Sequence, residues 1–231
     1  MEVSILLPCL NEINTLPSVL SKLSKLSFAG NAEVIAVDDG SIDDTFHFLN
    51  SNKFSYPFKM ICAKHSASLG KGAALSTGLG LSNGKIIMIQ DADCEYDPSD
   101  LEKFYEKVKY GGYDAVFGSR LLSGDNDIYS AFYFWGNKIM TFLINILFSG
   151  KLTDSYTGRK VFKRECAQSV FPESEGFEAE AEICCRLLNK KFHYCEIPIS
   201  YSPRTRKEGK KIKFSDSVKG FLKIVELRLK L

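Results

Sequence analysis

The sequence predicts an α/β protein with a mostly parallel central sheet and helices on both faces. In residues 1–120, short apolar runs alternate with helix-like segments, a rhythm typical of parallel strands joined by crossover helices. Polar side chains follow four of these runs directly, and ligands of such sheets bind outside the carboxyl ends of the strands. A chain of 231 residues is long enough for one well-filled domain, so we expect residues 1–231 to form a single domain.

The expected elements follow from apolar periodicity and from start and stop signals. Strands are predicted over 3–8, 33–39, 58–63, 85–90, 114–119, 160–164 and 193–201. Helices are predicted over 15–26, 41–49, 71–81, 98–109 and 178–190, and an amphipathic helix at the C-terminus. Ser41 is the expected N-cap of the helix over 41–49, with Asp44 at its third position.

Charge and cysteine content limit the classes of protein. Residues 1–100 hold 12 acids and 7 bases, whereas the remainder holds 16 acids and 23 bases, so the two parts are expected to do different jobs. The seven cysteines show no CxxC spacing, which argues against a disulfide framework or a structural zinc site and favours the reducing cytosol. The N-terminus lacks the basic and apolar regions of a signal peptide.

The segment IIMIQDADCEYDP carries an acidic residue at every second position after a buried strand pattern. In an extended segment Asp91 and Asp93 project to the same side, with Ala92 turned away. Two carboxylates held that close repel unless a proton or a cation lies between them. We therefore expect Mg²⁺ or Mn²⁺, completed by water and phosphate oxygens. Glu95 and Asp97 are also explained by the start of the next helix, which favours acids.

Several blocks, in order, resemble family 2 glycosyltransferases of the Rossmann-like GT-A fold. They are LLPCLNE, VIAVDDGSIDDT, SLGKGAAL and QDADCEYDP, in which DAD is similar to the DxD motif of the family. The later blocks FGSR, DSYTGRKVFKRE, GFEAEAEI and YSPRTRKEGKKI resemble the dolichyl-phosphate mannose synthase and glucosyltransferase branch. The resemblance covers nearly the whole chain and implies a nucleotide-sugar-binding half over 1–120 and an acceptor half over 121–231.

The resemblance implies roles for particular side chains. The implied nucleotide-sugar site comprises Pro8, Leu10, Glu12, Asp39, Lys71, Asp91, Ala92, Asp93, Arg204 and Lys210, and the implied metal site Asp91, Asp93 and Glu95. Asp93 and Arg120 are the expected catalytic residues. Lys71 is either a counter-charge for phosphate or a solvated lysine at a helix start, and its GKG context lacks the spacing of a P-loop.

The acceptor side is expected to be basic. Arg120 either meets an acceptor phosphate or forms a structural salt bridge. Asn137 and Lys138 are further acceptor candidates. The basic run YSPRTRKEGKKIK, residues 201–213, contains Arg204 and Lys210. The resemblance implies that it forms a loop that closes over the diphosphate. Nucleic acid is not an expected partner, because a nucleic-acid-binding module would leave the paired aspartates unexplained.

Residues 128–148 are long enough to span a bilayer, at roughly 31 Å for 1.5 Å per residue. Asn137, Thr141 and Asn145 recur every four residues, however, so the expected helix is amphipathic. Contact with a membrane interface or lipid, an ordinary core helix and a true span all remain open. The basic amphipathic C-terminal segment favours a peripheral enzyme on the cytoplasmic face of a membrane, docked directly or through an anchoring partner.

The resemblance, together with the acidic pair and the basic acceptor side, implies an inverting, metal-dependent transfer of a hexose to a polyprenyl (dolichyl-type) phosphate. The donor is a nucleotide diphosphate sugar of the GDP-mannose or UDP-glucose type. A phosphate acceptor is already ionised and needs no general base. The alternative, transfer to a sugar hydroxyl, needs a carboxylate base, for which Glu180 and Glu182 are the candidates. Asp154 is expected to orient the acceptor site.

Overall fold

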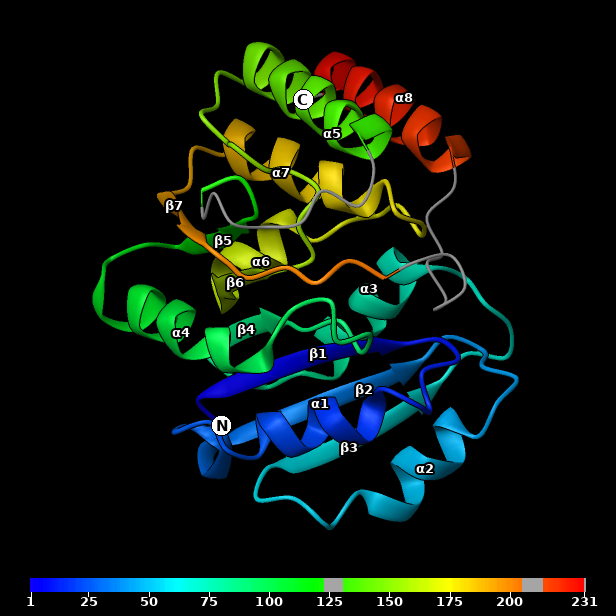
Figure 1. The fold of residues 1–231 in the computed structure, drawn as a ribbon. Helices are drawn as coiled ribbons and strands as arrows, with labels where there is room; N and C mark the ends of the chain where they lie inside the picture. Colours follow the sequence, from blue (N-terminus) through cyan, green and yellow to red (C-terminus); the bar gives the residue numbers. More distant parts are fainter. Residues whose placement is uncertain (123–130, 205–213, 231) are drawn as a thin grey trace.

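The computed structural model describes residues 1–122, 131–204 and 214–230. Its core is a seven-stranded sheet in the order β3-β2-β1-β4-β6-β5-β7. The strands are β1 (Val3–Cys9), β2 (Ala32–Asp38), β3 (Lys59–Lys64), β4 (Ile86–Ile89), β5 (Ala115–Ser119), β6 (Lys160–Lys163) and β7 (Tyr194–Pro198). All seven predicted strands are present, and the predicted α/β class is confirmed (Figure 1).

Helices cover both faces of this sheet. They are α1 (Leu16–Leu23), α2 (Thr45–Asn52), α3 (Lys71–Leu81), α4 (Leu101–Tyr110), α5 (Ala131–Phe148), α6 (Arg164–Val170), α7 (Ala179–Asn189) and α8 (Phe214–Lys230), with short 3-10 helices η1 (Ala29–Asn31) and η2 (Pro98–Asp100). Helix α6, which directly continues β6, was not predicted from the sequence. The predicted helix over 15–26 ends earlier, at Leu23.

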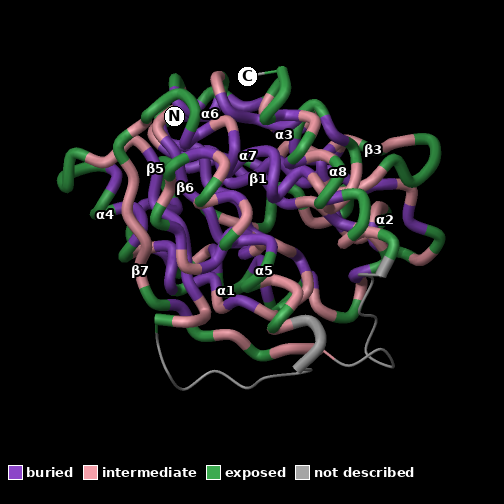
Figure 2. Tube along the Cα trace, turned by 90° about the horizontal axis from the view of Figure 1, so that it is seen from above, coloured by how far each residue is buried: buried purple, intermediate pink, exposed green. Residues whose placement is uncertain are grey.

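Alternation along the strands divides the core into two layers. In β1, Ile5 and Leu7 join the cluster that packs with α1 and α4, whereas Leu6 joins the cluster that contains side chains of α3, α6 and α7. Successive side chains of a strand point to opposite faces, so an apolar strand between two helical layers is buried on both sides. Figure 2 shows this distribution, with buried positions in the interior and exposed positions at the outer turns and helices.

One strand runs against the others. β6 pairs antiparallel with both β4 and β5, whereas the β1–β2, β1–β4, β2–β3 and β5–β7 pairs are parallel. The carboxyl ends of β1, β2, β4 and β5 therefore meet at one edge of the sheet. The beginning of β6 lies at that same edge, because β6 runs in the opposite direction. This reversal brings residues 154–160 to the strand ends that the sequence singled out.

The predicted N-cap at Ser41 is wrong. Helix α2 begins at Thr45, and Asp44 precedes it without a side-chain capping bond. The Ser41 hydroxyl instead accepts a hydrogen bond from the Asn11 backbone N–H at 2.8 Å. Asn11 Oδ1 in turn accepts a hydrogen bond from the Ile42 backbone N–H at 2.9 Å. Hydrogen bonds between the loops after β1 and β2 thus take the place of the predicted N-cap of α2 at Ser41.

Candidate active site

The acidic segment after β4 is a turn, so the expectation that it is extended is wrong. The strand ends at Ile89, so Asp91 and Asp93 do not lie on one extended segment. Each carboxylate has a cationic partner of its own. Asp91 Oδ1 lies 2.7 Å from Lys71 Nζ, and Asp93 Oδ2 lies 2.9 Å from an Arg204 guanidinium nitrogen. Their charges are thereby compensated from two different elements.

Arg204 gathers three carboxylates around one guanidinium. Besides Asp93, it bonds to Glu12 at 3.1 Å and lies 3.8 Å from Glu95. Its backbone N–H also donates to Glu95 Oε1 at 3.0 Å. The side chains of Asp93 and Glu95 are 18% and 13% exposed, so this cluster is partly open to solvent. The structure therefore brings together four residues that the sequence assigned to the nucleotide and metal sites.

Behind Asp91 lies a buried chain of alternating charges. Lys71 Nζ bridges Asp91 and Glu180, with 2.8 Å to Glu180 Oε1. The other oxygen of Glu180 pairs with Lys160, whose side chain is fully buried. Lys160 also donates to the carbonyl of Ser155 at 3.3 Å. The side chain of Lys71 is only 14% exposed, so the alternative of a solvated lysine at a helix start is wrong.

This arrangement sets the ionisation of its members. Burial alone would raise the pKa of Glu180, but the ammonium groups of Lys160 and Lys71 outweigh it and lower that pKa to about 2. For Asp91, burial is the largest influence and raises the pKa, assisted by Asp93 and Glu180 and opposed by Lys71. Burial and Glu95 likewise raise the pKa of Asp93 against the effect of Arg204. An additional cation beside Asp91 and Asp93 would therefore stabilise their ionised forms and lower these raised pKa values.

The donor set suits a hard divalent ion. Asp91, Asp93 and Glu95 offer carboxylate oxygens, the ligands that Mg²⁺ and Mn²⁺ prefer. Within the described parts of the chain, no three such side chains are already arranged to hold a metal ion. The guanidinium of Arg204 lies among the carboxylates instead.

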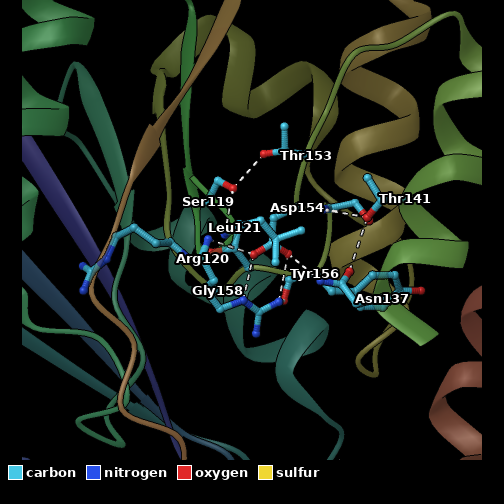
Figure 3. A network of polar contacts seen from close by, with 12 residues as sticks. Ser119, Arg120, Leu121, Asn137, Thr141, Thr153, Asp154, Tyr156 and Gly158 are labelled. Carbon is cyan, nitrogen blue, oxygen red and sulfur yellow. Dashed lines mark hydrogen bonds and ion pairs between the residues drawn. The ribbon is translucent and has the colours of Figure 1, made fainter. Parts of the chain in front are cut away.

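A second cluster lies after β5, around a buried aspartate. Arg120 Nε donates to Asp154 Oδ2 at 2.7 Å, and a terminal nitrogen donates to Asp154 Oδ1 at 2.8 Å. Asn137 of α5 donates to the same Oδ1 at 2.7 Å. Figure 3 shows these side chains converging from β5, α5 and the segment before β6. Asp154 is fully buried, whereas the Arg120 side chain is 19% exposed.

The two alternatives for Arg120 are thus not exclusive. The ion pair with Asp154 exists, and the contact with an acceptor phosphate stays a prediction. The carboxylate of Asp154 fixes the guanidinium in a bidentate arrangement, and the Tyr201 ring lies 5.0 Å from its centre. Lys138 does not join this cluster, since its ammonium lies over the rings of Phe134 and Trp135 at 4.8 and 5.6 Å.

Asp39 shapes the loop that leads to α3. Its carboxylate accepts hydrogen bonds from the backbone N–H groups of Leu69 and Gly70 at 2.9 and 2.8 Å and from the Ser68 hydroxyl at 2.8 Å. His65 Nδ1 lies 2.7 Å from the same carboxylate. The contact of Asp39 with a base or ribose stays a prediction, while its role in holding residues 65–70 is visible.

The remaining nucleotide candidates lie where the sequence put them or outside the described residues. Pro8 is in β1 opposite Val37, and Leu10 directly follows that strand. The Ala92 side chain is buried in the core, so only its backbone faces the site. Lys210 lies outside the described residues.

Comparison with known proteins decides the family. The family model described as Glycosyl transferase family 2 matches residues 4–171. The chain belongs to glycosyl transferase family 2. It is 29% identical over 248 residues to a dolichyl-phosphate beta-glucosyltransferase of Dictyostelium discoideum, covering 99% of this chain and 74% of that protein. It is 27% identical over 213 residues to a dolichol-phosphate mannosyltransferase of Pyrococcus furiosus, covering 91% of this chain but only 59% of that enzyme.

The fold is the GT-A fold of these transferases. A crystal structure of glucosyl-3-phosphoglycerate synthase from Mycobacterium tuberculosis, in complex with Mn²⁺, UDP and phosphoglyceric acid, matches with a TM-score of 0.73. The sequence identity is 19%, and the match covers 98% of this chain and 78% of that one. The predicted resemblance to family 2 glycosyltransferases is confirmed, and the protein is a glycosyltransferase.

Sequence reasoning missed three buried polar residues that support the site of this glycosyltransferase. Arg159 donates to Gln90 Oε1 at 2.5 Å and to the Asp97 carbonyl at 3.1 Å, and Gln90 Nε2 donates to the Asp91 carbonyl at 2.8 Å. Together they fix the turn over 91–97. Lys160 anchors Glu180 on the other side. The signal was present, because two neighbouring cations, Arg159 and Lys160, stand at the start of a predicted strand, directly before the apolar Val161 and Phe162.

Gly158 allows a close approach that no other residue permits. A Cβ at this position would lie 2.1 Å from Asp91 Oδ2 and 3.1 Å from Lys71 Nζ. We expect Gly158→Ala to displace the Asp91 carboxylate and to lower kcat/KM for sugar transfer by about 10²-fold, the effect of a displacement near 1 Å. Steady-state kinetics measure this. Gly80→Ala is the matched control, because its added methyl group would meet no atom within 4 Å beyond its chain neighbours and the backbone of its own helix. Equal losses in both variants would contradict the prediction.

Proposed function

We propose that this family 2 glycosyltransferase moves a hexose, with inversion and with a divalent metal, from a nucleotide diphosphate sugar to a polyprenyl phosphate of the dolichyl type. The donor is of the GDP-mannose or UDP-glucose type, and the reaction takes place at the cytoplasmic face of a membrane. The printed names of the relatives from Pyrococcus furiosus and Dictyostelium discoideum support the lipid acceptor. Crystal structures of the Mycobacterium tuberculosis neighbour with Mn²⁺ or Mg²⁺ and UDP support the metal and the donor class.

On the donor side, the residues that would hold the metal are Asp91, Asp93 and Glu95. A divalent ion there would stabilise the charge that develops on the departing diphosphate. Arg204 and Lys71 contribute cationic donors within 3 Å of Asp93 and Asp91, respectively. They hold the carboxylates in place and offer further donors to diphosphate oxygens.

On the acceptor side, Arg120 is the proposed ligand of the acceptor phosphate. A guanidinium offers paired donors that match phosphate oxygens. Burial alone would raise the pKa of Asp154, but the guanidinium of Arg120 outweighs this effect. The pKa of Asp154 is therefore lowered, and its carboxyl group stays ionised. The ion pair and the bond from Asn137 fix the orientation of the Arg120 side chain. A preorganised guanidinium of this kind positions the acceptor oxygen without rearrangement.

The observation that carries this proposal is the state of the two candidate bases. Glu180 is held as an anion by two lysines, with its pKa lowered to about 2. Glu182 accepts from the Ser174 N–H at 2.9 Å and from Arg186 Nε at 2.8 Å. An acid so firmly ionised is a weak base near neutral pH. Both residues therefore favour an acceptor that arrives already ionised, as a phosphate does, over a sugar hydroxyl.

Donor binding and acceptor use can be tested in separate measurements. A thermal-shift panel of GDP- and UDP-sugars, with and without Mn²⁺, is expected to show metal-dependent stabilisation by one nucleotide class, about 2.7 kcal/mol at 100 times the dissociation constant. Transfer is then expected with a short-chain prenyl phosphate and not with soluble sugars. Arg120→Lys keeps the charge but loses the paired donors, so it should raise the KM for the prenyl phosphate and leave the donor shift unchanged. Transfer to soluble sugars with the wild-type protein would contradict the proposal.

A further inference from the structure

We propose that the outward faces of α5 and α8 form a docking surface for an anionic lipid bilayer. Both helices carry large apolar side chains that point to solvent. This outer stripe comprises Trp135, Ile139, Phe142 and Ile146 on α5, and Val218, Phe221, Leu222, Val225 and Leu229 on α8. The four α5 side chains are 59–66% exposed, and contiguous exposed apolar patches of this kind mark interaction surfaces.

The stripe results from the way in which the two helices pack. On α5, the opposite side contributes Met140, Ile144 and Phe148 to the core, and on α8 the corresponding side contributes Ile224 and Leu227. Both helices pack on α7 and on each other. Figure 1 shows them side by side at one end of the molecule, with α7 beneath them. Their outer faces therefore point away from α7 in the same general direction.

The charges around the stripe favour lipid over a protein partner. The described parts of the two helices contain five cations, Lys138, Lys219, Lys223, Arg228 and Lys230, against Asp216 and Glu226. Glu226 pairs with Lys223 and Lys230 at 3.1 and 2.6 Å, so basic charge remains in excess. Lysines are depleted at protein interfaces, whereas lysines beside an apolar stripe are typical of helices that lie in an anionic membrane surface.

No helix among the described residues combines the length and hydropathy needed to cross a bilayer. The open question of a true span over 128–148 is thus answered for the part that forms α5. In an interfacial position, the apolar side chains of the stripe would lie at the boundary of the acyl chains. The lysine side chains would extend back to the headgroups.

Helix α5 also connects this surface to the acceptor cluster. Asn137 and Thr141 lie on its inner side, where Asn137 donates to Asp154 and the Thr141 hydroxyl lies 2.8 Å from that of Ser155 (Figure 3). Helix α5 thus carries the apolar stripe on one side and, on the other side, Asn137, which donates a hydrogen bond to Asp154. The link to lipid acceptors rests on the proposed function, but docking itself does not require it.

Trp135 is the single tryptophan of the chain and belongs to the stripe, so it reports docking directly. The full-length protein is mixed with vesicles of phosphatidylcholine alone, or with phosphatidylglycerol added. With the anionic vesicles we expect a blue-shifted Trp135 emission, quenching by brominated lipids, and co-flotation that weakens at high salt. The double variant Phe142→Ser/Ile146→Ser should bind at least about tenfold more weakly.

Phe54→Ser is the matched control, because Phe54 is 89% exposed but lies outside the stripe, and its binding should equal that of the wild type. Unchanged Trp135 emission with anionic vesicles would overturn the proposal. A wild-type dimer in sedimentation that is lost in the double variant would also overturn it, because a second copy of the chain would then cover the stripe. The vesicles contain neither sugar nucleotide nor prenyl phosphate, so failure here leaves the transfer reaction, assayed with a water-soluble prenyl phosphate, unaffected.

Discussion

Asp91→Asn is expected to lower kcat/KM for sugar transfer by about 10²–10³-fold and to remove the metal-dependent part of nucleotide-sugar binding. The substitution keeps the shape of the side chain and removes one negative charge beside the proposed diphosphate site. Electrostatic stabilisation of the departing group is typically worth about 3–4 kcal/mol, which corresponds to this range. Lys71 remains held by Glu180 at 2.8 Å, so the fold around the site should survive.

Kinetics and thermal shift with and without Mn²⁺ measure both parts of this prediction. Asp97→Asn is the matched control, since Asp97 belongs to the same loop but pairs with Lys22 at 2.6 Å and accepts a hydrogen bond from the Ser99 N–H at 2.9 Å. Its activity should stay within about fivefold of the wild type, the contribution of a surface ion pair. An Asp91→Asn variant that retains a full Mn²⁺-dependent shift would count against the metal site.

Lys160→Met is expected to destabilise the protein by about 3–5 kcal/mol, because it leaves Glu180 with one cation fewer in a buried setting. Glu180→Gln should cost a similar amount by leaving Lys160 and Lys71 with an excess positive charge. In the double variant the remaining buried pair, Lys71 with Asp91, is balanced again. We therefore expect the double variant to be less destabilised than the sum of the single variants, by a coupling of about 1–3 kcal/mol.

Denaturant unfolding of the four proteins measures this coupling. Strict additivity would show that Lys160 and Glu180 act independently, contrary to their contact. Lys163→Met is a suitable control for the loss of a lysine, since Lys163 is 44% exposed in its pair with Asp114. Its substitution should cost no more than about 1 kcal/mol.

The same chain of charges predicts a pH dependence. The pKa of Glu180 is lowered from 4.5 to about 2 in the folded protein. A lowered carboxyl pKa contributes stability that is fully present above the unfolded value and is lost as the pH falls through the folded value. The contribution is about 3 kcal/mol, lost between pH 4.5 and 2. Glu180→Gln should show a correspondingly shallower loss of unfolding free energy over that interval, and parallel curves would contradict the assignment.

Much of the fold was predictable because it depends on local periodicity. Alternating and continuous apolar runs located all seven strands, and the helix predicted over 71–81 has the observed bounds. Errors arose where distant segments compete for the same polar groups. The Ser41 hydroxyl bonds to the loop after β1 instead of capping α2, and the acidic segment turns because Gln90 and Arg159 hold it from behind.

The sequence alone determined the family, the α/β architecture and the strand ends at which polar side chains collect, because strand period and motif order are properties of short segments. The tertiary structure decided which charges meet. Lys71 faces Glu180, Arg204 faces Glu12, and Arg120 faces Asp154, pairs that no local pattern connects. The physical reason lies in the reversed direction of β6, the packing of α7 and the parallel pairing of β7 with β5. They bring residues far apart in the chain to one edge, where buried charges must find partners.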